Sequence, residues 1–373
     1  MRRVPCQYLQ PGMVLANHVY NYDGRVLLAK GVSLTETYIA GLIQKGIISV
    51  YVEDEISKDI YISDIVLEET RLEATKQVKH IFDNIYSGLI TEKTTDLKTI
   101  KSITSKIIDQ LLQNKNLLYE LVDVRAVGDY LFSHSVNVCV LALTTGLALK
   151  MSRSQLEQLS VGAIFHDIGK ALTPPKILNK PGKLEVDEFE EMKKHPVHSL
   201  SILRKNDNVD SVSRIIAYQH HEKVNGSGYP LGKKGDEILE MSQIVGMVDI
   251  YDAVTSERCY SKAMPPNKAF ELISASSDQY FNSNIVNSFL SQIAAFPSGS
   301  PVELNTGEVA IVVQNYKYLP FLPRVRVLAD PDGAILKPFN EIELSEHTER
   351  KITRILEEYE IQNILLKIKK MLK

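Results

Sequence analysis

The sequence predicts a mainly α-helical protein, in which a helical central domain is flanked by a small α+β module and by a small β module with a terminal helix. Apolar residues recur at helical spacing through the middle of the chain, and they alternate with polar residues at strand spacing near both ends. Turn signals such as Asp23-Gly24 and Asn305-Thr306-Gly307 separate the strand-like stretches. We therefore expect five segments, at residues 1–56, 57–127, 128–297, 298–345 and 346–373.

Length, charge and cysteine usage limit the function classes. A chain of 373 residues can bury the cores of two or three domains. The formal net charge of -3 gives no polybasic signal for duplex nucleic acid, so local charges would have to hold an anionic substrate. The sequence has no signal-peptide pattern and no run of 18 apolar residues, which predicts no membrane span and a cytoplasmic location. Cys6, Cys139 and Cys259 lack CxxC spacing and are interpreted as reduced thiols.

The first segment carries a hairpin signal and a helix signal. Asp23-Gly24 lies between the strand-like stretches Val14–Tyr20 and Arg25–Ala29. Ser33-x-x-Glu36 is a capping-box pattern for a helix that ends near Gly46. We expect a small α+β module without a catalytic constellation.

The second segment holds two polar amphipathic stretches, Asp59–Ser87 and Leu97–Asn114. They predict a connecting layer of helices. Such a layer could pack on the central domain, carry a homodimer contact, or relay the binding of a signalling partner to a flanking module.

The central domain opens with a predicted helix that places His134 on one apolar face with Val138, Leu141 and Thr145. Alone, such a histidine is more often a core residue than a ligand. The next helix is predicted to begin at a capping box, Ser154-x-x-Glu157, and to deliver the His166-Asp167 pair to the core. Gly169 is then expected to let the chain leave in a left-handed turn.

Further histidines and carboxylates end apolar stripes in the same domain. His195 precedes Pro196 at a helix boundary, and His220 ends the next stripe with His221 rotated by about 100° from it. Asp249 and Asp252 lie on the apolar face of a long helix, where carboxylates are hard to bury unless they are ligated or paired. Six of the nine histidines fall between residues 134 and 221, and imidazole and carboxylate donors without thiolate favour Fe, Mn or Zn.

Two dense stretches carry a resemblance to a known family. They are His166-Asp167-Ile168-Gly169-Lys170 and the run from His220-His221-Glu222 to Gly226-Ser227-Gly228-Tyr229-Pro230. Together they resemble the HD-GYP family, whose members are helical metal-dependent phosphodiesterases that open cyclic di-GMP. The resemblance implies an HD-type all-helical catalytic domain, and the first segment is similar to modules that often precede such domains. The chain departs from the second motif at Asn225, where the family usually has Asp.

The resemblance also implies a binuclear metal site. Asp167 would bridge two divalent ions, Fe or Mn, and a metal-bridged hydroxide would attack phosphorus and give linear pGpG. Some members hold a third metal through a glutamate at the position of Tyr130, so we expect two metals here, and any onward cleavage to GMP to be slow. By this resemblance the metal ligands are His134, His166, Asp167, His195, His220, His221 and Asp249.

For several other candidate site residues the sequence allows two interpretations. Lys170 could neutralise a phosphoryl oxygen or be a solvated surface lysine, and Glu222 could orient a ligand histidine or form a surface salt bridge. The resemblance implies that Arg258 grips guanine or phosphate, although Ser261 stands where the family has a second basic residue. The remaining expected substrate contacts are Gly226, Gly228, Tyr229 and Asp252, with a plain turn as the alternative for the glycines.

The last two segments predict strands at 301–304, 308–314 and 324–328, followed by an amphipathic helix from Arg350 to Lys373. For function, two alternatives stay open beside the phosphodiesterase. One is a degenerate receptor that binds cyclic di-GMP or a partner without turnover, as Tyr130, Asn225 and Ser261 would allow. The other is an HD phosphohydrolase that acts on another nucleotide, against which the Gly-Tyr-Pro loop argues.

Overall fold

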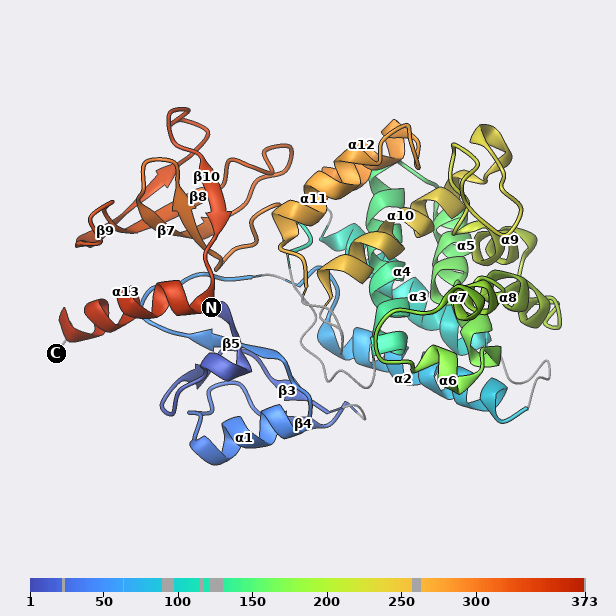
Figure 1. The fold of residues 1–373 in the computed structure, drawn as a ribbon, viewed down its shortest axis with the longest axis horizontal. Helices are drawn as coiled ribbons and strands as arrows, with labels where there is room; N and C mark the ends of the chain where they lie inside the picture. The colour runs from blue at the N-terminus through green and yellow to red at the C-terminus, as the bar shows by residue number, and fades with distance from the viewer. Residues whose placement is uncertain are drawn as a thin grey trace.

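The fold was analysed in a computed structural model that describes residues 1–21, 24–62, 64–88, 97–114, 117–120, 130–256 and 263–371. A bundle of helices forms one part of the molecule, and two small strand-rich modules lie together beside it (Figure 1). The predicted fold class, mainly α with a small module at each end, is confirmed.

The N-terminal module combines a three-stranded sheet of order β1-β5-β2, a hairpin of β3 and β4, and one helix. Its core includes Val4, Leu15 and Val50. The predicted capping box is wrong, because Thr35 rather than Ser33 caps the helix by accepting from the Tyr38 amide. The bounds are β1 (Arg2–Pro5), β2 (Val14–Leu15), β3 (Val19–Tyr20), β4 (Val26–Leu28), α1 (Glu36–Gln44) and β5 (Ser49–Glu53).

Two connecting helices follow, α2 (Glu68–Tyr86) and α3 (Leu97–Gln113). The first begins nine residues later than the stretch from Asp59 suggested, since residues 59–62 and 64–67 form turns and irregular chain. Both helices bury an apolar face in the same core as the central domain, through residues such as Val78 and Ile107. The connector is therefore part of the helical body.

The central domain is a set of helices packed around α4. The stretch Leu131–Ala148 is long and apolar enough to cross a membrane by composition, but 78% of it is buried, as in a core helix. The predicted capping box of the second helix is wrong by two residues, because Ser152 and Gln155 form it. The main helices are α4 (Tyr130–Ala148), α5 (Arg153–Ile164), α6 (Pro175–Leu178), α7 (Val186–Met192), α8 (His195–Leu203), α9 (Ser211–Gln219), α10 (Glu240–Thr255), α11 (Pro266–Ala275) and α12 (Ser283–Leu290).

The C-terminal module is an antiparallel sheet of order β10-β6-β7-β8-β9, closed by α13 (Glu358–Met371). The expected helix from Arg350 is wrong at its start, because Ile352–Ile355 pairs with β6 as an edge strand. Val312 faces the helical core while its neighbour Ile311 packs with α13, so both faces of the sheet are covered. The strands are β6 (Pro301–Leu304), β7 (Val309–Gln314), β8 (Arg324–Ala329), β9 (Ile335–Glu343) and β10 (Ile352–Ile355).

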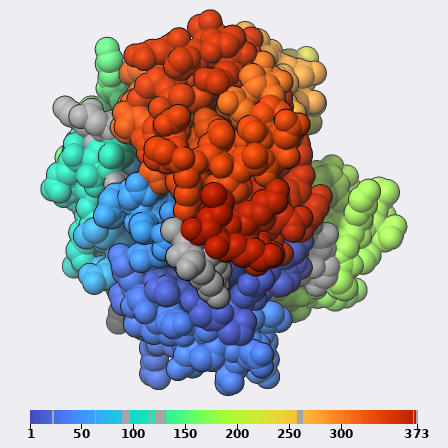
Figure 2. Space-filling view, turned by 90° about the vertical axis from the view of Figure 1, so that its left-hand side faces the viewer, coloured from blue at the N-terminus to red at the C-terminus, as the bar shows by residue number. Residues whose placement is uncertain are grey.

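The two small modules are joined by buried charges. Arg2 in β1 is 1% exposed and forms ion pairs with Asp54 and with Glu358 of α13. In the space-filling view, α13 in dark red lies along the boundary between the blue N-terminal module and the C-terminal module above it (Figure 2). The first strand and the last helix are thus held against each other.

Candidate metal centre

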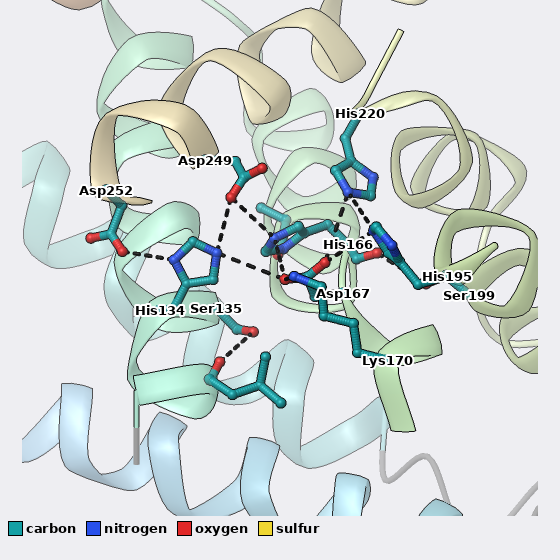
Figure 3. Close-up of polar contacts among 12 residues, drawn as sticks. His134, Ser135, His166, Asp167, Lys170, His195, Ser199, His220, Asp249 and Asp252 are labelled. Carbon is teal, nitrogen blue, oxygen red and sulfur yellow. Dashed lines mark hydrogen bonds and ion pairs between the residues drawn. The ribbon is translucent and has the colours of Figure 1, made fainter. Parts of the chain in front are cut away.

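Five segments of the helical domain bring histidines and carboxylates to one buried point. His134 comes from α4, the His166-Asp167 pair from the turn after α5, and His195 from the first residue of α8. The end of α9 adds His220 and His221, and α10 adds Asp249 and Asp252. The sequence-predicted ligands are therefore together in space, and most of them are shown in Figure 3.

The carboxylate of Asp167 lies in the middle of the cluster and is 1% exposed. Its Oδ2 atom lies 3.3 Å from His166 Nε2 and 3.8 Å from His134 Nε2. Its Oδ1 atom lies 3.3 Å from His195 Nε2 and 3.9 Å from His220 Nε2. One carboxylate thus separates two groups of imidazoles, with an oxygen directed at each (Figure 3).

Backbone carbonyls fix the tautomers of three of these imidazoles. The Nδ1 atoms of His166, His195 and His220 lie 2.7, 2.8 and 2.9 Å from the carbonyl oxygens of Ala163, Met192 and Ala217. A carbonyl accepts only, so each Nδ1 is the N–H donor and each neutral ring keeps its lone pair on Nε2. The three lone pairs then face the cluster.

These lone pairs need a positive partner. His195 Nε2 and His220 Nε2 are only 3.3 Å apart, and with both Nδ1 atoms protonated neither nitrogen can donate to the other. Among the described residues, His166 Nε2 and Asp167 Oδ1 are buried without a hydrogen-bond partner. Buried polar atoms of this kind are costly unless a cation binds them, so the residues fit a metal site.

His134 is held from both sides by α10. Its Nδ1 atom is 2.7 Å from Asp252 Oδ2 and its Nε2 atom is 3.0 Å from Asp249 Oδ1. Asp252 is one of the expected substrate contacts; in the structure its carboxylate is 4% exposed and orients the His134 imidazole. Asp249 and Asp252 stand one helical turn apart on the same face, which places both carboxylates beside this imidazole.

The charges in the centre divide it into two parts. Burial would lower the pKa of His134, but its contacts with Asp249 and Asp252 outweigh burial and raise the pKa to about 9. Burial lowers the pKa of His195 to about 4, and burial together with neighbouring imidazoles holds the pKa values of His220 and His221 well below the usual range. These three rings are thus neutral at pH 7, the state in which imidazole binds a metal.

Lys170 contributes a charge at the edge of the centre. Its Nζ atom lies 2.5 Å from Asp167 Oδ2, and its side chain is 22% exposed. Burial would raise the pKa of Asp167, yet its contacts with His166 and Lys170 hold it well below the usual range. The lysine is therefore neither a free surface residue nor fully enclosed.

Within the part of the chain that the structure describes, three groups of side chains have the spacing of a metal site, with donor atoms within 4.8 Å of one another. Asp167 belongs to two of them, so two ions that share its carboxylate would fit the arrangement. The groups are Asp167 with His195, His220 and His221; His134 with His166 and Asp167; and His166 with His220 and Asp249.

Gly169 has a different role from the one expected. It lies inside a short 3₁₀ helix, Ile168–Leu172, and its φ is not positive, so the predicted left-handed turn is wrong. A Cβ atom at this position would lie 2.0 Å from the His195 carbonyl oxygen and 2.5 Å from the Ser199 amide nitrogen. Glycine is required because α8 packs directly on this backbone, which brings His195 to Asp167.

The Gly-Tyr-Pro loop is built around Glu222, which is 1% exposed. Its two carboxylate oxygens accept from the amides of Leu231 and Lys233, so the expected bond to a ligand histidine is corrected to a bond that shapes this loop. Gly228 packs against the backbone of His221 and Glu222, where a Cβ would lie 2.4 Å from the His221 carbonyl oxygen. Packing therefore explains Gly228 without a ligand.

Three more residues of this loop belong to the motif. The Tyr229 ring stacks on His221 with centroids 4.6 Å apart. Asn225 accepts from the amide and hydroxyl of Ser227, which an aspartate could do equally well, while Gly226 adopts a positive φ of 83° in the same turn. Arg258 and Ser261 lie outside the described residues, as does the side chain of Tyr130.

Comparison with known proteins agrees with this geometry. Residues 109–285 match the HD domain family, and residues 301–364 match a KOW domain associated with the HD domain. A cyclic di-GMP phosphodiesterase of Thermotoga maritima is 31% identical over 258 residues, which cover 65% of this chain and 70% of that protein. The chain belongs to the HD-GYP family.

Two further relatives of this HD-GYP protein have names that state a substrate. A cyclic di-GMP phosphodiesterase of Pseudomonas aeruginosa is 28% identical over 67% of this chain, and the chain spans 60% of that relative's length. A 3'3'-cGAMP-specific phosphodiesterase of Vibrio cholerae is 38% identical over 150 residues, which cover 40% of this chain and 32% of that protein. All three relatives carry phosphodiesterase names, the enzyme class expected from the sequence.

Proposed function

We propose that this HD-GYP protein is a metal-dependent phosphodiesterase that opens cyclic di-GMP to linear pGpG, with slow onward cleavage to GMP. The observation that carries this proposal is the Asp167 carboxylate, whose two oxygens face separate groups of imidazoles across a buried centre. A site of this form suits two adjacent cations, and paired cations are suited to in-line attack on a phosphodiester.

The side chains have separate roles in this proposal. Seven residues would hold two divalent ions, Fe or Mn, which when bound supply an activated water and neutralise phosphoryl oxygens. The carbonyls of Ala163, Met192 and Ala217 keep three imidazoles in the tautomer that can bind. Asp252 holds His134 in the same way from the opposite side. The proposed ligands are His134, His166, Asp167, His195, His220, His221 and Asp249.

On the substrate side, Lys170 is the proposed phosphate contact. Its ammonium group lies at the partly open edge of the Asp167 carboxylate, where it can add positive charge to a phosphoryl oxygen. Tyr229, stacked on His221, is the proposed platform for a guanine base. Arg258 completes the proposal as a bidentate contact to guanine or phosphate.

A different cyclic dinucleotide is the second candidate substrate, because one relative is named as a cGAMP-specific phosphodiesterase. A receptor without turnover is the remaining alternative. The ordered Asn225 turn weakens that alternative, since the loop keeps its hydrogen bonds despite the substitution. A cytoplasmic location is also proposed, supported by the three cysteines, which lack the spacing of a disulfide framework.

The test combines metal analysis with turnover of cyclic di-GMP and 3'3'-cGAMP in the presence of Mn or Fe(II). Asp167→Ala should lose both metals and all turnover, whereas Lys170→Ala should keep the metals and lose rate by about a hundredfold. Lys176→Ala, at an exposed lysine of α6, is the matched control. Fully active Asp167→Ala protein would refute the proposal, and metal-loaded protein that is inert to both dinucleotides would favour the receptor.

A further inference from the structure

A cavity of about 290 Å³ lies between the N-terminal module and the connector, apart from the metal centre. The module contributes β3, the residues before it, Lys30 and part of β5, and the connector contributes the start of α2 (Figure 1). Its size suits a small molecule rather than a macromolecule. The lining residues used below are Tyr20, Lys30, Tyr51, Asp64, Glu68, Arg71 and Tyr119.

The cavity walls carry side chains of both charge signs. Asp64 and Arg71 pair with each other at 3.4 Å on the connector side. Lys30, on the module side, and Glu68, on the connector side, add opposite charges across the cavity. Tyrosine rings from the module and from residue 119 provide apolar faces between them.

We propose that this cavity binds a zwitterionic ligand of the size of a free amino acid. The ligand carboxylate would meet Lys30, its ammonium group would meet Glu68, and its side chain would lie against Tyr20 and Tyr51. A ligand of one charge is disfavoured, because an anion would also meet the acidic wall and a cation would also meet Lys30. A ligand that contacts both walls ties the module to the connector.

Arg71 links the cavity to the metal centre. It is 4% exposed, and its Nη1 atom donates to Asn137 Oδ1 on α4 at 3.2 Å. Asn137 lies one helical turn after His134 and lines a small cavity together with Asp252, the residue that orients His134. A shift of the connector wall would therefore be passed to the elements that hold this ligand. This coupling rests on the proposed phosphodiesterase function, whereas ligand binding does not.

Binding is tested by calorimetry on the full chain with a panel of the common amino acids. The best binder is then compared with its decarboxylated amine and its deaminated acid; for phenylalanine these are phenethylamine and 3-phenylpropionate. The amino acid should bind at least about tenfold more tightly than either analogue, since each analogue lacks one charged contact. Equal binding of one analogue, or no binding of any amino acid at millimolar concentration, would overturn the proposal.

Variants assign the two contacts. Lys30→Gln and Glu68→Gln should each weaken binding about tenfold, whereas Lys45→Gln and Glu55→Gln, at exposed positions away from the cavity, should not. Wild-type affinity in both cavity variants would overturn the assignment. For the coupling, saturating ligand should change cyclic di-GMP turnover in the wild type, and Arg71→Lys should bind the ligand but lose this response. Turnover that ignores a bound ligand would overturn the coupling alone.

Discussion

Replacing Gly169 with alanine tests how the metal centre is assembled. The added methyl group would lie 2.0 Å from the His195 carbonyl oxygen, although ordinary contacts begin near 3.4 Å, so α8 and the 3₁₀ helix must move apart by about 1.4 Å. Metal-ligand distances tolerate only about 0.2 Å. The substitution should therefore remove His195 from the ligand set, lower turnover by about a hundredfold, and cost about 1–3 kcal/mol of stability through overpacking.

The assay pairs urea unfolding of the metal-free protein with calorimetric titration of Mn and with turnover. Gly41→Ala is the matched control, because that glycine lies inside α1 and an added Cβ would meet nothing within 4 Å. It should raise the free energy of unfolding by about 0.5–1 kcal/mol and leave metal binding unchanged. If Gly169→Ala unfolds and binds metal like the wild type, close packing of α8 does not position His195.

Three more predictions follow from the site. Asp252→Asn should weaken metal binding about 10–100-fold while the fold persists, and unchanged metal affinity would show that His134 needs no orienting carboxylate. Metal-free protein should lose stability as pH falls from 6.5 towards 4, because His195 binds a proton in the unfolded chain but stays neutral in the folded protein. It should also lose stability as pH rises from 6.5 through 9, because His134 then loses the proton that it holds only in the folded protein. A thermal midpoint that stays constant from pH 5 to 9 would contradict both pKa shifts. Glu222→Gln replaces one of the two oxygens that accept from backbone amides with an NH2 group, so the loop loses a hydrogen bond. Limited proteolysis should then cut this loop faster than in the wild type, and an unchanged cleavage rate would contradict the prediction.

The resemblance to the HD-GYP family implied the proposed ligand set, and the spacing of apolar residues around some of its members agreed with it. A histidine or aspartate that ends an apolar stripe is visible in the spacing alone, and such spacing brought His134 and Asp249 into consideration. Their partners were harder to predict. Asp252 and Glu222 act through bonds to residues that the chain brings near only after folding, so their sequence neighbours do not reveal which group each one meets.

The errors in secondary structure have local physical causes. The capping box at Ser154 failed because Ser152 offers an equivalent box with Gln155 two residues earlier, and propensity alone does not choose between them. The helix predicted from Arg350 failed because Ile352–Ile355 is recruited by β6, a tertiary pairing that overrides a helical pattern. Gly169 was assigned to a turn because close helix packing leaves no mark in the sequence around it.

The ion pair between Arg2 and Glu358 joins the first strand to the last helix, so it closes the polypeptide into a ring that runs through the helical body. Because of this ion pair, one small module cannot rotate relative to the helical body without moving the other. Truncation of α13 would remove Glu358 and leave Asp54 as the partner of the buried Arg2 guanidinium, which should lower the free energy of unfolding by about 3–5 kcal/mol. The first strand and the last helix are therefore coupled mechanically, so a displacement of either small module also displaces the other.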